Sequence, residues 1–280
     1  METMTVYGLP LLFDAEERET ADWVGEAVEK SVHLLKEIWN LDTPRDCRIY
    51  VMTGWRQFMF QAAPWPWQLW IRMTLPLWTS RAQKMWDIAG GFHQSFGRRR
   101  AVGVKPFRLI EQADSSIGKR IFVAEEYASP QRKVQHVACH ELTHAFTAHL
   151  KLPMWLNEGL AMRTVDFFAK TLTVQAQTIK ALDRAALNTD SSRYQQIDPR
   201  DPETVLYHAV RGYWLTRFLE YQHPALLKQL ITEHRDHRAM DQDIAQAVGL
   251  DVSRLWQHID RIVVDHVDQS DVNASPLFPT

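Results

Sequence analysis

The sequence predicts an α+β protein, with an N-terminal lobe built from a small mixed β-sheet and helices and a C-terminal lobe that is mainly helical. Before residue 130, short β-forming runs and proline-interrupted segments accompany one long helical pattern. After residue 130, capped helical patterns follow one another with short breaks. The chain of 280 residues is long enough for two lobes with a sizeable core. We therefore expect lobes at residues 1–130 and 131–280, without a flexible linker.

In the N-terminal lobe, Asp14 precedes apolar residues at helical spacing, which predicts an amphipathic helix over 15–40. Cys47–Met52 is rich in β-forming residues and predicts a short strand. The tryptophan-rich segment 55–86 contains Pro64, Pro66 and Pro76, so we expect no long helix there.

The last part of this lobe predicts two strands, Ala101–Ile110 and Arg120–Val123, on either side of a turn at Ser115–Gly118. The chain then changes character. Ser129 followed by Pro130 predicts the start of a helix that runs to about residue 150.

The C-terminal lobe continues with helices that begin at cap residues or prolines. Pro153 separates the helix at 131–150 from one over about 157–170. Further helices are expected from Pro202 to about Tyr221, from Pro224, and from Asp251, with Gly249 as the stop before the last one. The tail from Asp268 is polar, and we expect it to be loose.

The composition excludes several classes of protein. Lys and Arg number 32 against 34 Asp and Glu, a balance that disfavours nucleic acid as a partner. Two cysteines, Cys47 and Cys139, cannot form a disulfide framework and indicate a reducing compartment. The sequence has no typical secretory signal and no long uncharged apolar stretch. We expect a cytoplasmic protein, with peripheral membrane association as an open alternative.

The helix after Ser129 contains the motif HELTH at residues 140–144. His140 and His144 lie one turn apart on one helix face, so both imidazoles can bind one zinc ion, while Glu141 projects beside the metal as a general base. Roughly 0.03 such motifs are expected by chance in this composition. His136 can support the site from one turn before, although a helix-surface or core role is the simpler interpretation. His149 points away from His140.

The motif HELTH followed by WLNEGLA at residues 155–161 resembles the gluzincin metallopeptidases, which include thermolysin and the aminopeptidase N family. The resemblance implies Glu158 as the third zinc ligand, one Zn²⁺ per chain, and a zinc site in the cleft between the lobes. It also implies a metallopeptidase that hydrolyses peptide bonds in a peptide or protein substrate. No counterpart of the segment that holds the substrate amino terminus in aminopeptidases is present, so we take an endopeptidase as the default.

The same resemblance implies a tyrosine that donates a hydrogen bond to the developing oxyanion. Tyr207 is our candidate, with Tyr213 and His208 as alternatives. Arg211 lies on the same helical stripe as Tyr207, which indicates a stripe facing a cavity. Thermolysin has an aspartate one turn after its zinc glutamate, and the nearest equivalent here is Asp166, one turn further on.

Six of the 11 tryptophans fall between residues 55 and 86, and the segment 62–78 is the most aromatic. It can form a packed cap over the core or an exposed contact with a membrane or a protein. A second function class also stays open: a zinc-binding regulatory or scaffold protein whose peptidase-like site is idle. The sequence does not indicate the oligomeric state.

Overall fold

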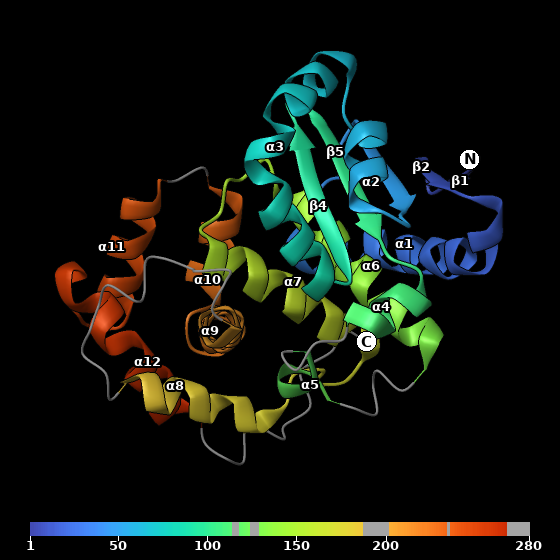
Figure 1. Cartoon of the computed structure of the whole chain (residues 1–280). Coiled ribbons are helices and arrows are strands. Elements are labelled where there is room, and N and C mark those ends of the chain that lie inside the picture. Colours follow the sequence, from blue (N-terminus) through green and yellow to red (C-terminus); the bar gives the residue numbers. More distant parts are fainter. Residues whose placement is uncertain (114–117, 124–128, 187–201, 234–235, 268–280) are drawn as a thin grey trace. The chain divides into compact units, whose positions relative to one another are not determined.

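The computed structural model has the predicted α+β fold class (Figure 1). It divides into two compact units, and the first contains the sheet while the second is built from helices. The first unit comprises Met1–Lys119 and Ala124–Ala148, and the second comprises Arg120–Val123 and His149–Thr280. The structure describes residues 1–113, 118–123, 129–186, 202–233 and 236–267.

The first unit contains a five-stranded mixed sheet with the strand order β1-β2-β3-β5-β4. Its strands are β1 (Glu2–Val6), β2 (Leu9–Phe13), β3 (Cys47–Val51), β4 (Gly91–Phe96) and β5 (Arg99–Val104). The hairpins β1–β2 and β4–β5 are antiparallel, whereas β2–β3 and β3–β5 are parallel. The predicted strand at 47–52 is therefore confirmed and lies at the centre of the sheet.

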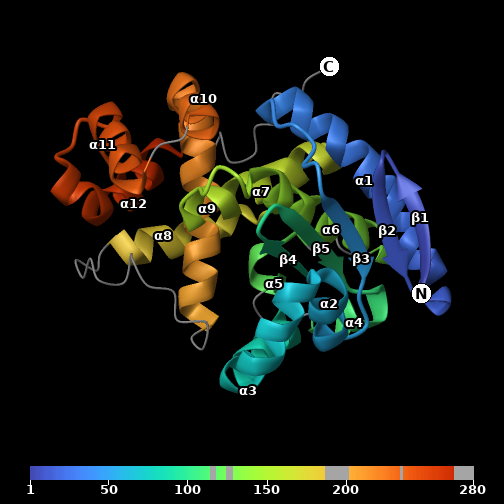
Figure 2. The same ribbon diagram turned by 90° about the horizontal axis from the view of Figure 1, so that it is seen from above.

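Helices cover both faces of this sheet (Figure 2). One face packs against α1 (Arg18–Trp39) and α6 (Pro130–Thr147), which also contact each other. The other face forms a core cluster with α2 (Trp55–Ala62) and α3 (Trp65–Ile88), in which Tyr50 and Phe96 of the strands meet Phe58 and Ile71 of the helices. The helix predicted over 15–40 is confirmed as a short 3-10 turn at Ala15–Glu17 followed by α1.

The prediction that prolines prevent a long helix in the tryptophan-rich segment is wrong. Pro64 is the N-cap of α3 and Pro66 lies in its first turn, where the missing N–H costs nothing. Pro76 lies inside the 24-residue helix, which continues to Ile88. A proline in the helix interior removes a backbone hydrogen bond, and packing of the inner side of α3 on the core cluster offsets that loss.

The prediction of two strands around a turn at 115–118 is confirmed only for Ala101–Val104, which belongs to β5. β5 ends at Val104 and the chain continues into two short helices, α4 (Phe107–Ala113) and α5 (Gly118–Ile121). The antiparallel partner of β5 is the preceding strand β4, joined to it through Gly97 with a positive φ of 63°. Residues 115–117 of the expected turn lie outside the described residues, and Phe122 forms an isolated bridge with Val174.

The second unit consists of helices within its described residues. They are α7 (Met154–Ala169), α8 (Ile179–Ala186), α9 (Pro202–Gln222), α10 (Pro224–Thr232), α11 (His237–Ala247) and α12 (Leu255–His266). The expected helices at 157–170 and 202–221 are confirmed. Between Pro224 and Gly249 the sequence predicts one helix, and the structure has two, α10 and α11. The tail from Asp268 lies outside the described part of the chain.

Helix α7 packs on α9 through two glycines. A Cβ added to Gly159 would lie 2.3 Å from the carbonyl oxygen of Gly212, and one added to Gly212 would lie 2.5 Å from the carbonyl oxygen of Trp155. Both distances are far shorter than a carbon–oxygen contact allows. The glycines therefore permit the two helix backbones to touch, which gives the glycine of the WLNEGLA segment a packing role.

The boundary between the two units differs from the predicted one at residue 130. Helix α6 belongs to the first unit, because it packs on β4, β5 and α1, and the division falls after Ala148. The HELTH helix thus belongs with the sheet and not with the helical unit. None of the described helices has both the length and the apolar character that crossing a bilayer requires.

Candidate metal centre

The candidate metal ligands His140 and His144 lie on one face of α6, as their spacing predicts. Ser129 caps this helix, and Pro130 occupies its first position. The two Nε2 atoms are 3.0 Å apart, with the imidazole planes nearly perpendicular at 86°. Two nitrogen ligands of a tetrahedral zinc ion are about 3.3 Å apart at ordinary Zn–N distances, so this histidine pair fits a shared zinc ion.

Glu141 points from α6 towards the edge strand β4. A Cβ added to Gly91 of this strand would lie 2.5 Å from Cγ of Glu141 and 2.8 Å from a methyl group of Val137. The glutamate chain thus occupies space that only a glycine leaves open. The candidate base Glu141 and the candidate ligands His140 and His144 therefore all project from α6, and the side of α6 that faces β4 is closely packed.

His93 on β4 was not singled out by the sequence analysis. Side chains alternate along a strand, so His93 and Ser95 share the side of β4 on which Gly91 meets Glu141. Burial lowers the pKa of His93 to about 3, with smaller contributions from His144 and Arg100. His93 is therefore a neutral, polar side chain near the histidine pair, and Ser95 Oγ lies 3.4 Å from its Nε2.

Glu158 lies on α7, which begins at Met154 after the N-cap Pro153. It therefore falls at the start of the second turn, not in the first turn as the predicted helix start implied. Only six residues, 148–153, connect α6 to α7, which limits how far the start of α7 can lie from the end of α6. His140, His144 and Glu158 each offer one ligand atom, these atoms lie within 4.8 Å of one another, and the group could hold a metal ion.

The predicted oxyanion donor Tyr207 has a hydrogen-bond partner within the second unit. Its hydroxyl donates to Asp260 Oδ2 on α12, and Arg211 Nε donates to Oδ1 of the same carboxylate at 2.7 Å. Asp260 and Arg211 are both buried. The stripe of Tyr207 and Arg211 therefore packs on a buried carboxylate, and the expectation that it faces a cavity is wrong.

The alternatives to Tyr207 are also placed in packed surroundings. Tyr213 is fully buried and its hydroxyl donates to Asp166 at 2.9 Å. Burial and the Asp166 carboxylate raise the pKa of Tyr213, so its proton stays in place. His208 is buried, and its ring meets the Tyr207 ring edge to face. This geometry singles out none of the three as an oxyanion donor, and the role of Tyr207 stays a prediction.

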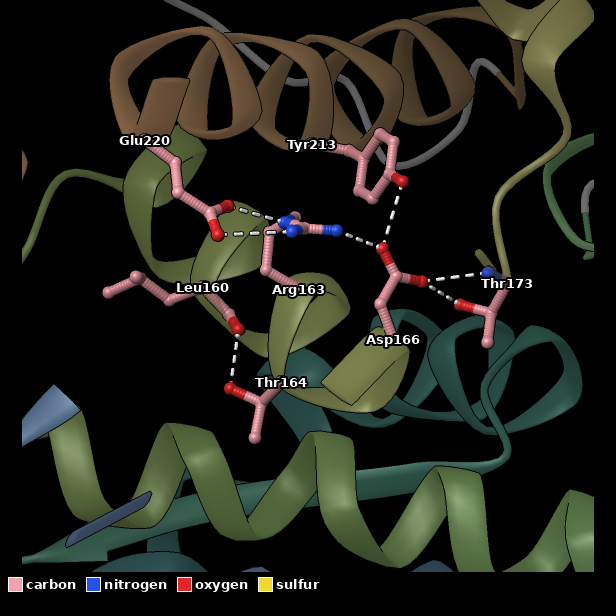
Figure 3. A network of polar contacts seen from close by, with 7 residues as sticks. All are labelled: Leu160, Arg163, Thr164, Asp166, Thr173, Tyr213 and Glu220. Atoms are coloured by element: carbon pink, nitrogen blue, oxygen red, sulfur yellow. Dashed lines mark hydrogen bonds and ion pairs between the residues drawn. The ribbon is translucent and has the colours of Figure 1, made fainter. Parts of the chain in front are cut away.

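Asp166 forms the centre of a buried polar network between α7 and α9 (Figure 3). Its Oδ2 accepts from Arg163 and Tyr213, and its Oδ1 accepts from the backbone N–H and hydroxyl of Thr173 at 2.7 and 2.8 Å. Arg163 also binds Glu220 through two hydrogen bonds of 2.8 and 3.1 Å. These partners give Asp166 a role in joining helices of the second unit.

The remaining candidates on or after α6 differ in exposure. His136 is buried, and burial lowers its pKa to about 4, which keeps it neutral. Cys139 is buried and free, and burial raises its pKa to about 12, so it remains a thiol. His149 is exposed and follows the end of the helix. Cys47 is likewise free and buried.

Comparison of the chain with protein-family models, with curated proteins and with solved structures finds no match. The resemblance to gluzincins therefore depends on the HELTH and WLNEGLA residues alone.

Proposed function

We propose that the protein is a zinc-dependent metallopeptidase in which His140, His144 and Glu158 hold one zinc ion. The observation that carries the proposal is the histidine pair on α6, whose Nε2 atoms are 3.0 Å apart, with Glu141 between them in sequence. Two imidazoles and one carboxylate are a frequent ligand set of catalytic zinc, which leaves a fourth position open.

The chemistry follows from the ligand set and the position of Glu141. When bound, zinc would act as a Lewis acid and would lower the pKa of water at its open position. Glu141 would accept a proton from the attacking water at its carboxylate and pass it to the leaving amine. Contact with the backbone at Gly91 would hold the Glu141 side chain in one orientation, which is what a general base needs.

A peptide is the substrate class that best suits the neighbouring sheet. β4 is the last strand in the sheet order, so one side of its backbone has no partner strand among the described residues. An extended peptide can pair with such an edge through main-chain hydrogen bonds. Because Glu141 lies beside Gly91 at the start of β4, a peptide paired there would pass close to the candidate base. We keep the endopeptidase as the default reaction.

The test combines metal analysis with a screen of quenched peptide libraries. We expect about one zinc per chain, lost in His140→Ala and His144→Ala. Glu141→Gln should keep its zinc but lose hydrolysis by about two orders of magnitude or more, because a general base contributes that much. Glu203→Gln is a matched control, because this glutamate is exposed and pairs with Arg120 far from the motif in sequence.

The outcomes separate the peptidase from the scaffold alternative. Full zinc retention in either histidine variant would refute the metal site. Zinc in the wild type without hydrolysis of any library peptide would favour the zinc-binding regulatory or scaffold protein. Equal hydrolysis by wild type and Glu141→Gln would assign the activity to another site.

A further inference from the structure

The outward side of the first half of α3 is apolar. Trp65, Leu69, Trp70, Met73 and Leu77 are all more than half exposed, with 77% for Trp65 and 87% for Leu77. Their spacing of three and four residues places them along one stripe of the helix, which we call the α3 outer face. Of the two alternatives that the sequence leaves open for this segment, the exposure of these five side chains agrees with a contact surface and not with a packed cap.

The opposite side of the same helix packs on the core cluster. Ile71 is buried in the core cluster, and Trp78 and Trp86 pack against that cluster. The first half of α3 is thus apolar on its inner and its outer side, and its outer side is not needed for the core. A surface helix ordinarily carries polar residues there, and a helix with apolar residues all round is typical of buried or membrane-contacting segments.

The charge of this region is one-sided. Residues 53–88, which end with α3, contain four basic residues, Arg56, Arg72, Arg81 and Lys84, against one acidic residue, Asp87. Arg72, Arg81 and Lys84 are exposed, and the last two follow Leu77 at the end of the α3 outer face by about one and about two turns. Tryptophan prefers the boundary between the acyl chains and the headgroups of a bilayer, and arginine beside it attracts phosphate.

We propose that the α3 outer face docks on an anionic lipid surface, with α3 lying in the plane of the interface. The five apolar side chains would enter the headgroup boundary while Arg72, Arg81 and Lys84 bind lipid phosphates. The placement of α3 on the outside of the sheet agrees with this role (Figures 1 and 2). The inference is independent of the proposed peptidase activity.

Charge also distinguishes a lipid surface from a second copy of the chain. In a twofold dimer the same patch meets itself, so the arginines of one copy would approach those of the other. The α3 outer face itself carries no acidic side chain that could pair with them, and Asp87 follows its last residue, Leu77, by ten positions. An anionic surface supplies the missing charge, whereas self-association would add repulsion.

The test is sedimentation with vesicles of phosphatidylglycerol and phosphatidylcholine in equal parts, beside vesicles of phosphatidylcholine alone. The wild-type protein should bind the anionic vesicles at low salt and lose binding as salt is raised. The variant Arg72→Gln/Arg81→Gln should bind the anionic vesicles more weakly, by about fivefold for each arginine removed. The control variant is Lys228→Gln/Arg238→Gln, which changes two exposed basic residues of the second unit and should bind like the wild type. Leu69→Gln/Met73→Gln/Leu77→Gln should weaken binding by about tenfold or more with an unchanged circular dichroism spectrum.

Several results would overturn the proposal. One is a wild-type protein that stays in the supernatant with both kinds of vesicle at low salt. Another is equal vesicle binding by the wild type and the arginine variant. This comparison can be made even if the triple variant fails to fold. A third is a wild-type dimer that the triple variant converts to a monomer without any vesicle binding, which would assign the α3 outer face to a second copy. Equal binding to anionic and to phosphatidylcholine vesicles would contradict the proposed role of the basic side chains in binding lipid phosphates.

Discussion

At the scale of single residues, Gly91 is where the candidate site depends most directly on the absence of a side chain. An alanine there would bring its Cβ to 2.5 Å from Cγ of Glu141, so the glutamate must move. We expect Gly91→Ala to keep its zinc and to lose about 100-fold in kcat/KM, because a small displacement of a catalytic group can cost that much. Peptide hydrolysis and metal content measure the two effects.

Gly90→Ala is the matched control for this variant. A Cβ at Gly90 would meet Val137 at 3.1 Å and would not meet Glu141. It should therefore retain most of the activity. Equal losses in the two variants would show that the strand, and not the position of Glu141, is what the substitutions disturb.

Tyr207 offers a second test at this scale, because its hydroxyl donates to the buried Asp260. Removing a hydrogen bond to a charged group costs about 1.5–3 kcal/mol, so we expect Tyr207→Phe to lower the free energy of unfolding by that amount. Because the sequence predicts the same hydroxyl as the oxyanion donor, we also expect turnover to fall by about 10²–10³. Turnover within a few-fold of wild type would contradict that role. Tyr221→Phe, at a partly exposed tyrosine of the same helix, is the control.

At the scale of elements, helices with local start signals could be predicted from the sequence. Ser129 with Pro130 marks the start of α6, and a proline at 153 precedes α7, because caps and prolines act through the backbone of their own turn. Strand β4 could not be predicted in this way. Its sequence GFHQSF has few strong β-formers, and its conformation depends on pairing with β5.

The joining of α7 to α9 gives the prediction that belongs to this scale. Asp166 is fully buried and accepts from Arg163, Tyr213 and Thr173, so Asp166→Ala would leave the buried Arg163 guanidinium with Glu220 as its remaining ion-pair partner among the described residues. Breaking a buried ion pair from one side costs about 3–5 kcal/mol, and we expect that loss in urea unfolding. Glu220→Gln, at the partly exposed end of the network, should cost about 1 kcal/mol. Similar losses in both variants would contradict a network centred on Asp166.

At the scale of the whole molecule, the fold class followed from the sequence but the division into units did not. The pattern of α6 specifies an amphipathic helix, and it does not specify whether a sheet or other helices cover its apolar side. The structure places α6 against β4, β5 and α1. The same limit applies to the candidate site. His140, Glu141 and His144 could be found because one helix fixes their spacing, whereas His93 comes from a strand whose position depends on tertiary pairing.

The response of the whole chain to zinc removal tests the metal centre without any substrate. A ligand that binds only the folded state stabilises it by about 4 kcal/mol when its concentration is 1,000 times its Kd. For a chain of this size that corresponds to roughly 10 °C in the unfolding midpoint. We therefore expect a chelator to lower the midpoint of the wild-type protein by about 10 °C and to leave that of His140→Ala unchanged. His149→Ala, which changes an exposed histidine outside the candidate ligand group, should respond like the wild type. An equal chelator effect in His140→Ala would mean that the stabilising metal binds elsewhere, because no ligand of the proposed centre would then be needed for it.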